Sequence, residues 1–201
     1  MKNNQRNKLM KLFLLSMIVV ALVLSTSLPG TTDTVEAAGF KYSKKVPLTK
    51  SQQKYLYDLC VKRGLNYKHT LAVIKHESNF KAKAKGGSNY GLFQINKVNH
   101  KNLAKVTKTK NSPYDVKVNM NWGTYMLSDL KKKYAKKGYK GTALREAYLS
   151  AYNKGEGGFA KYGKATAYIK RHNQALKVVK TWRRNKAKIC FGLVVGRKKS
   201  I

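Results

Sequence analysis

Apolar residues recur at the spacing of an α-helix in several separate segments of this chain. In the longest of them, Trp122, Met126, Leu130 and Tyr134 follow one another at four-residue steps. Residues four apart lie on one face of a helix, so residues 116–135 are predicted to form an amphipathic helix with one buried side. Shorter stripes of the same kind contain Leu56, Leu59 and Cys60; Leu71, Ala72 and Ile74; Leu144, Ala147, Tyr148 and Ala151; and Ile169, Leu176 and Val179. The chain is therefore constrained to fold as helices around a shared core.

The ends of these helices are marked by capping residues and glycines. Thr49 and Gln52 have the spacing of a capping box, and Asn66 is a good N-cap for the second helix. Gly64, Gly138 and Gly141 separate neighbouring helices, and residues 155–158 are expected to break the chain before the fifth helix. Residues 90–96 are short and partly β-like. The predicted class is α+β, predominantly α, with one small β-like element.

The first residues have the pattern of a secretory signal. Four basic residues precede an apolar run from Leu12 to Leu24, which is shorter than the roughly 20 residues of a membrane span. Val35-Glu36-Ala37 then supplies small residues at the positions that a signal peptidase reads. We expect residues 1–38 to be a signal peptide cleaved after Ala37 or Ala38, so that the protein is secreted. The alternative is an uncleaved anchor.

The rest of the chain is expected to form one domain. Residues 39–48 are predicted to be a basic linker, residues 49–182 the folded domain, and residues 183–201 a basic and apolar tail. About 160 residues are enough to bury a core as a monomer. In an exported chain Cys60 and Cys190 can form a disulfide, and two unpaired thiols are the equally open alternative.

The chain is strongly basic. It carries 43 lysines and arginines against eight acidic residues, a formal net charge of +35. Removal of residues 1–38 takes away four of the 43 and two of the eight, which leaves about +33. Outside a cell this charge favours anionic wall polymers, anionic lipids or nucleic acid, and the charge alone does not choose among them.

Several common catalytic sequence motifs are absent from the sequence. It contains no Gly-x-Ser-x-Gly elbow, no Walker loop and no His-Glu-x-x-His pair. The four histidines lack the spacing of metal ligands, and adjacent residues such as His76 and Glu77 point about 100° apart on a helix. We therefore expect no metal and no cofactor.

One of the few carboxylates has an unusual position. Beyond residue 38 the acidic residues are Asp58, Glu77, Asp115, Asp129, Glu146 and Glu156. Glu77 ends an inward-facing helix three residues after Ile74, which places it at the edge of the core. Partial burial raises the pKa of a carboxyl group toward neutrality, as a general acid requires. The alternative is a solvent-exposed glutamate at a helix end.

Three sequence blocks resemble a known family. In order and spacing, they are similar to the signature blocks of the soluble lytic transglycosylase catalytic domain. The blocks are Glu77-Ser78-Asn79-Phe80, then Ser88-Asn89-Tyr90-Gly91-Leu92-Phe93-Gln94-Ile95, and then Ala151-Tyr152-Asn153-Lys154-Gly155. That family belongs to the lysozyme-like superfamily, and the resemblance covers about residues 50 to 180. Ser112-Pro113-Tyr114-Asp115, followed by Asn119 and Gly123, also resembles the family. The resemblance implies a lysozyme-like single domain with the β-like element beside a cleft.

The resemblance also implies an activity and a set of site residues. Glu77 is then the catalytic carboxylate, which protonates the MurNAc-β-1,4-GlcNAc bond of peptidoglycan and afterwards accepts the proton of the MurNAc 6-hydroxyl, giving a 1,6-anhydro product. The substrate-binding residues that it implies are Ser78, Ser88, Gln94, Tyr152, Asn153 and Tyr168. One departure is that Gly86 and Gly87 stand where the family often has a second serine.

Two other functions compete with this one. Animal-type lysozymes have an aspartate where this chain has Asn89, so a hydrolytic muramidase is disfavoured, although Asp115 or Glu156 could supply a distant base. The second is a non-catalytic cell-wall-binding protein. The expected partners are peptidoglycan glycan strands, with anionic wall polymers possible and no specific nucleic acid.

Overall fold

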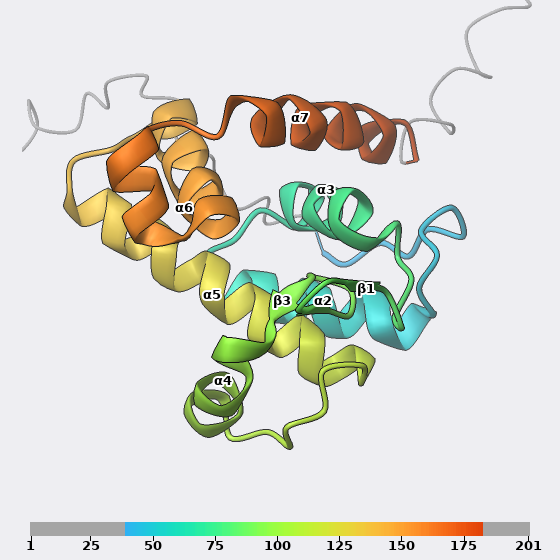
Figure 1. The fold of residues 1–201 in the computed structure, drawn as a ribbon. Helices are drawn as coiled ribbons and strands as arrows, with labels where there is room; N and C mark the ends of the chain where they lie inside the picture. Colours follow the sequence, from blue (N-terminus) through green and yellow to red (C-terminus); the bar gives the residue numbers. More distant parts are fainter. Residues whose placement is uncertain (1–38, 183–201) are drawn as a thin grey trace, which may run out of the picture. The chain divides into compact units, whose positions relative to one another are not determined.

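Six α-helices, one 3-10 helix and three short strands make up residues 39–182, the part of the chain that the computed structural model describes (Figure 1). The helices are α2 (Lys50–Lys62), α3 (Tyr67–Ser78), the 3-10 helix η1 (Lys97–Asn99), α4 (His100–Thr107), α5 (Val116–Lys136), α6 (Gly141–Tyr162) and α7 (Thr166–Thr181). The strands are β1 (Lys85–Gly86), β2 (Asn89–Tyr90) and β3 (Ile95–Asn96). The predicted signal peptide, the predicted tail and Cys190 lie outside the described residues.

The predicted starts of the first two helices are confirmed. The Thr49 hydroxyl accepts a hydrogen bond from the Gln52 backbone N–H (3.2 Å), and the Thr49 N–H donates to the Gln52 side chain (2.9 Å). The Asn66 side chain accepts from the His69 N–H at 3.2 Å and caps α3. Each cap satisfies backbone donors that a helix leaves unpaired at its first turn.

The helices pack around one core, as the apolar stripes predicted. Trp122, Leu130 and Tyr134 are buried along α5, which contacts α2, α4 and α6. Helices α3 and α7 lie side by side, and Ile74 and Ile169 are among the residues buried along them (Figure 1). The strands form an antiparallel sheet in the order β1-β2-β3. The α+β class, predominantly α, is confirmed.

Three segments differ from the prediction. The expected break at residues 155–158 is reduced to a kink, because only Gly155 leaves the helical conformation and α6 continues to Tyr162. Helix α4 was not anticipated, since only His100 and Leu103 of it are buried and so short a stripe has no clear period. Residues 39–48 do not form a free linker, because Val46 and Leu48 are buried and the Gln53 amide donates to the Ser43 and Leu48 carbonyls, each at 2.9 Å.

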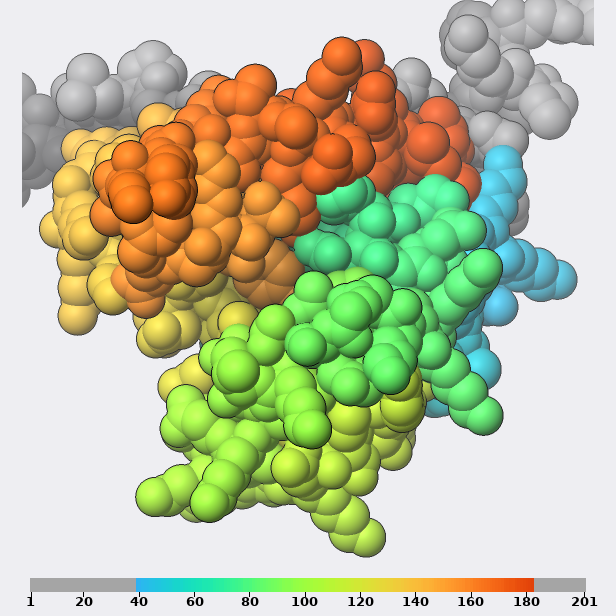
Figure 2. All heavy atoms as spheres, viewed as in Figure 1, coloured from blue at the N-terminus to red at the C-terminus, as the bar shows by residue number. Residues whose placement is uncertain are grey.

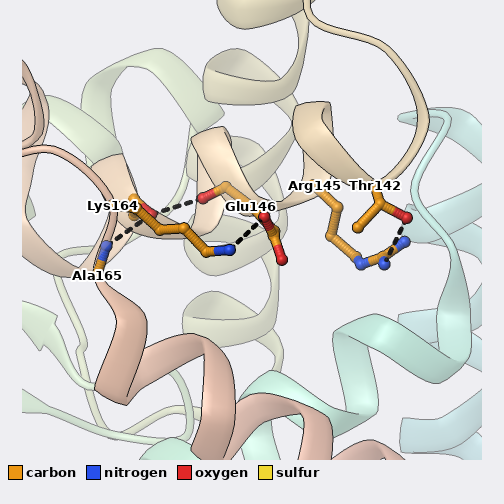
Figure 3. Close-up of polar contacts among 6 residues, drawn as sticks. Thr142, Arg145, Glu146, Lys164 and Ala165 are labelled. Carbon is orange, nitrogen blue, oxygen red and sulfur yellow. Dashed lines mark hydrogen bonds and ion pairs between the residues drawn. The ribbon is translucent and has the colours of Figure 1, made fainter.

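The connection between α6 and α7 is fixed by polar contacts (Figure 3). Lys164 forms an ion pair with Glu146 at 2.6 Å, and the Ala165 N–H donates to the Ser150 hydroxyl at 3.0 Å. The same hydroxyl donates to the Glu146 carbonyl at 2.6 Å. These contacts hold the residues just before α7 against α6. They therefore help to orient α7, which packs on α3 further along its length.

Cys60 is buried in α2, and burial raises the pKa of its thiol to about 12. Whether it pairs with Cys190 stays untested. Within residues 39–182, none of the helices combines the length and the apolar character that crossing a membrane requires.

Candidate active site

A cleft of about 640 Å³ collects residues from α3, the sheet, η1, α4, α5 and α6. Its volume lies in the range of roughly 300–1,000 Å³ that is usual for ligand pockets. Figure 2 shows a hollow where the orange residues of α6 meet the green residues of the sheet and α4. Glu77, Gln94, Tyr152 and Asn153, four of the predicted site residues, line this cleft.

Glu77 stands on the last turn of α3 and is partly buried. Burial raises the pKa of its carboxyl group from the ordinary 4.5 to about 7. The hydrogen bond from Tyr168 and the positive charge of Arg171 oppose this rise and favour the ionised form. A group with a pKa near 7 is present in both protonation states at neutral pH, so Glu77 can first donate and then accept a proton.

Tyr168 reaches Glu77 from α7 and does not itself line the cleft. Its hydroxyl donates to Glu77 Oε1 at 2.6 Å, and its side chain is 2% exposed. The His76 ring packs edge-on against the Tyr168 ring, with centroids 4.7 Å apart. Burial, and then the charges of Arg171 and His172, lower the pKa of His76. Tyr168 is therefore held between α3 and α7 in a position that orients the carboxyl group.

The loop that carries Gln94 is held at both sides of Phe93. The Phe93 N–H donates to Asn119 Oδ1 at 2.9 Å, and the Tyr152 hydroxyl donates to the Phe93 carbonyl at 2.6 Å. Asn119 is itself buried, and its amide N–H groups donate to the Tyr90 and Pro113 carbonyls. Tyr152 thus both lines the cleft and fixes the wall opposite α6.

Close packing explains the glycine four residues after Asn119. A Cβ atom on Gly123 would collide with the Phe93 ring, so only glycine lets α5 approach the loop. The sequence resemblance around Asn119 and Gly123 therefore marks residues that shape the cleft from behind it.

Gln94 has a left-handed backbone, with φ of 46°. Its side-chain amide donates to the Ala84 carbonyl at 3.1 Å and to the Gly91 carbonyl at 2.9 Å. These bonds occupy both of its side-chain N–H donors. Gln94 therefore lines the cleft, and its amide oxygen is the atom that remains available to a ligand.

Ser78 and Ser88, which were predicted to bind substrate, are absent from the cleft lining. Ser78 is buried and its hydroxyl donates to the Ile74 carbonyl at 3.1 Å, because the residue after Glu77 points about 100° away on the helix and into the core. Ser88 is exposed between β1 and β2, and its carbonyl accepts from the Lys97 N–H at 2.8 Å. The predicted role of Ser78 and Ser88 is therefore not supported by their positions. Asn153 is exposed at the cleft beside Tyr152.

Two carboxylates that sequence reasoning left open take different places. Asp115 accepts from the Val118 N–H at 2.9 Å and caps α5, outside the cleft lining. Glu156 lines the cleft next to the Gly155 kink and is paired with Lys133.

Other lining residues were missed by sequence reasoning. They include Asp129, one turn after Tyr125 on α5, and the asparagines Asn96, Asn99 and Asn102. The signal available in the sequence was the three-residue spacing of the asparagines, which lies in a segment for which no helix was predicted. Within residues 39–182, no three His, Cys, Asp or Glu side chains gather closely enough to hold a metal ion.

Comparison with known proteins shows that the chain matches a family model. The family described as "Transglycosylase SLT domain" matches residues 58–175, which contain all the predicted site residues. No curated protein matches the chain by sequence. Among solved structures, an inactive mutant of the lytic transglycosylase Slt from Pseudomonas aeruginosa is similar, with a TM-score of 0.48 and 19% identity. The similarity covers 68% of this chain and 23% of that chain, so the chain spans about a quarter of the length of that protein.

Proposed function

The chain belongs to the transglycosylase SLT domain family, and we propose that it is a peptidoglycan lytic transglycosylase in which Glu77 is the only carboxyl group that takes part in the chemistry. The observation that carries this proposal is the state of Glu77. It is partly buried in a ligand-sized cleft, its pKa is raised to about 7, and Tyr168 holds its Oε1 oxygen.

The first step requires a protonated Glu77. The carboxyl group gives its proton to the oxygen of the bond between MurNAc and GlcNAc, the bond from that oxygen to MurNAc C1 breaks, and GlcNAc leaves with a 4-hydroxyl. Glu77 becomes a carboxylate, and the Tyr168 hydroxyl then donates to a charged acceptor, a stronger bond than to a neutral one. Tyr168 therefore stabilises the state in which the proton has been transferred.

The second step uses the carboxylate as a base. Glu77 takes the proton of the MurNAc 6-hydroxyl, and the 6-oxygen forms a bond to C1. Glu77 is protonated again, no water is consumed, and the product carries a 1,6-anhydro ring. The uncharged Asn89, which lines the cleft, supplies no nucleophile, so we propose that the substrate's N-acetyl group stabilises the positive charge at C1 between the two steps.

A hydrolytic muramidase is the competing reaction. It needs a second carboxylate near the bond that is cut, and Asp129 and Glu156 line the same cleft as Glu77. The ion pair between Glu156 and Lys133 favours a structural role for Glu156. The identity of the new sugar end separates the two reactions, because a muramidase leaves a reducing MurNAc and a transglycosylase leaves an anhydro-MurNAc.

The experiment is a digestion of purified peptidoglycan, with the sugar ends identified by mass spectrometry. We expect anhydro-MurNAc ends from the unchanged protein and from Asp58→Asn, a control that removes an exposed carboxylate paired with Lys54. Glu77→Gln should form none. Reducing ends that disappear in Asp129→Asn or Glu156→Gln would establish the muramidase. Binding without cleavage would establish the non-catalytic wall-binding protein.

The site of action is part of the same proposal. We propose export through the segment of residues 1–38 and cleavage near Ala37 or Ala38, since peptidoglycan lies outside the membrane. N-terminal sequencing of the protein recovered from the medium or the wall tests this directly.

A further inference from the structure

One wall of the cleft is built from asparagine side chains. Asn89 on β2 and Asn96 on β3 are direct partners in the antiparallel sheet, so their side chains stand on the same face. Asn99 and Asn102 follow at three-residue steps and share one side of the turn from η1 into α4. All four line the same cleft as Glu77.

Asn99 is the residue whose local structure most clearly points to a ligand. It precedes the first residue of α4, the position at which an asparagine side chain usually caps the backbone N–H groups. Here its backbone is already helical, with φ of −88° and ψ of −16°, and its side chain makes no capping bond. The half-buried Asn99 amide is thereby left for the cleft.

The neighbouring asparagines Asn96 and Asn102 also line the cleft, and they differ in the hydrogen bonds that their side chains already make. Asn96 takes over the capping role for η1, since its Oδ1 atom accepts from the Val98 N–H at 3.1 Å. Its amide N–H groups remain available. Asn102 is exposed one turn after Asn99 and lines the cleft as well. Tyr125 and Met126 line the cleft from α5 and supply apolar surface against which a sugar ring can pack.

The hydrogen-bonding properties of these asparagine side chains indicate which chemical group they would bind. Each asparagine amide both donates and accepts hydrogen bonds without carrying charge. An acetamido group is the matching partner, because it too has one N–H donor and one carbonyl acceptor. A half-buried amide that gains both bonds on binding avoids the penalty of an unsatisfied polar group.

We propose that Asn99 and Asn102 form a subsite that binds the acetamido group of an N-acetylated sugar in the glycan strand, apart from the bond that is cut. This proposal rests on the proposed function for the identity of the strand. In this proposal the asparagine wall selects N-acetylated over unsubstituted sugars, and Glu77 carries out the bond cleavage.

The experiment measures binding and needs no cleavage. The probes are the β-1,4-linked tetramer of N-acetylglucosamine and cellotetraose, a neutral tetramer with hydroxyls in place of the acetamido groups. The protein with Glu77→Gln is titrated with each by NMR, alone and combined with Asn99→Ala and Asn102→Ala. The control is Asn111→Ala, an exposed asparagine outside the cleft lining.

We expect the N-acetylated tetramer to bind the protein with intact asparagines at least about tenfold more tightly than cellotetraose. Removal of Asn99 and Asn102 should weaken binding of the N-acetylated tetramer about tenfold, as expected for the loss of one or two hydrogen bonds, and leave cellotetraose binding unchanged. Asn111→Ala should change neither. Asn102→Ala alone, at an exposed position, should show a smaller loss of the same kind and guards against an effect of misfolding.

Three results of the binding experiment would overturn the proposal. They are equal weakening of both probes, retention of the full preference in the double variant, and tighter binding of cellotetraose than of the N-acetylated tetramer. The kinetic counterpart, in the presence of Glu77, is a raised KM for peptidoglycan with kcat unchanged, and a fall in kcat alone would also overturn it.

The outcome is separable from that of the proposed function. If the protein cleaves peptidoglycan and the asparagine variants bind normally, the subsite fails and the reaction stands. If the protein forms no new sugar ends and the asparagine variants lose the N-acetylated tetramer, the reaction fails and the subsite stands.

Discussion

The protonation of Glu77 links the proposed reaction to the stability of the fold. Its pKa is about 7 in the folded protein and 4.5 as an ordinary glutamate, so the folded state binds the proton more tightly than the unfolded state. Below pH 4.5 both states are protonated and the group costs nothing. Between pH 4.5 and about 7 the unfolded state gives up its proton while the folded state keeps it, so stability falls, and above about 7 the folded state holds a partly buried negative charge and the loss is complete.

Glu77→Gln should therefore stabilise the protein at high pH and leave it unchanged at low pH. The upper limit of the gain is about 3 kcal/mol above pH 8, since one pKa unit corresponds to about 1.4 kcal/mol, and water at the cleft reduces it. Chemical unfolding at pH 4 and pH 8 measures the difference between the two proteins. A variant that is less stable than the unchanged protein at pH 8 contradicts the burial argument.

Tyr168→Phe tests the orientation of the same carboxyl group. Its hydrogen bond lowers the Glu77 pKa, so its removal should raise that pKa further and move the alkaline limb of the pH–kcat profile to higher pH. We also expect kcat to fall about tenfold or more with little change in KM, because the lost bond strengthens as the proton leaves. The pH–rate profile measures both effects.

The matched control for Tyr168→Phe is Tyr162→Phe, which removes the hydroxyl of a tyrosine that is 66% exposed at the end of α6. Its profile should coincide with that of the unchanged protein. An unshifted profile for Tyr168→Phe would show that the hydroxyl does not act through Glu77.

At the scale of an element, α6 is bent where it forms the cleft wall. Gly155 has φ of 71° and ψ of 162°, a conformation that is accessible almost only to glycine. The residues before the bend place Tyr152 and Asn153 at the cleft, and the residue after it is Glu156. The glycine cluster that suggested a break in the helix is thus a single bend followed by more helix.

Gly155→Ala and Gly157→Ala should have opposite effects on stability. Alanine at Gly155 forces a strained backbone and should cost about 1–3 kcal/mol. Gly157 is helical and a Cβ atom there meets nothing within 4 Å, so alanine should stabilise the fold by about 0.4–1 kcal/mol. Denaturant unfolding of both variants measures this contrast. A loss of similar size for both would mean that the bend is not what requires the glycine.

For the molecule as a whole, the basic and the acidic side chains are distributed differently with respect to the cleft. Beyond residue 38 there are six acidic residues, and three of them, Glu77, Asp129 and Glu156, line the cleft. Among residues 39–182, Lys154 is the one basic residue of the cleft lining, so the excess of basic charge in this part of the chain lies mostly outside the cleft. We propose that this surface holds the protein to anionic wall polymers while the cleft binds the uncharged sugar rings.

Salt should separate these two contacts. Raising the ionic strength from about 0.1 M to about 1 M shortens the screening length from roughly 10 Å to 3 Å, so binding to walls that carry anionic polymers should fall at least about tenfold. Cleavage of soluble glycan strands should change less than about twofold, because the cleft contacts are short and partly buried. Co-sedimentation with walls and product analysis measure the two. Walls stripped of the anionic polymers are the control and should show a much smaller salt dependence of binding.

Local patterns in the sequence predicted five of the helices, and the resemblance of three sequence blocks to a known family singled out Glu77 as the candidate acid. Thr49 with Gln52, Asn66 and the four-residue stripe from Trp122 to Tyr134 act within a few residues of themselves, so a linear reading predicts the helices that they form. The position of Glu77 after Ile74 indicated the edge of the core but left a solvent-exposed glutamate as the alternative, and the structure shows a partly buried side chain. Helix α4 and the continuation of α6 were not predictable, because their apolar stripes are too short to have a clear period.

The contacts of the site were decided by the tertiary structure. Tyr168 meets Glu77 across 91 positions of sequence, and Tyr152 meets Phe93 across 59. Such bonds form only when α7 packs on α3 and α6 packs against the loop, and no local spacing encodes their direction. For the same reason the sequence did not show that Asn89 and Asn96 of the sheet share one cleft with Asn99 and Asn102. Local sequence specifies the helices and the side chains that they carry, whereas packing specifies which of those side chains become buried together, and it is this burial that raises the Glu77 pKa to about 7.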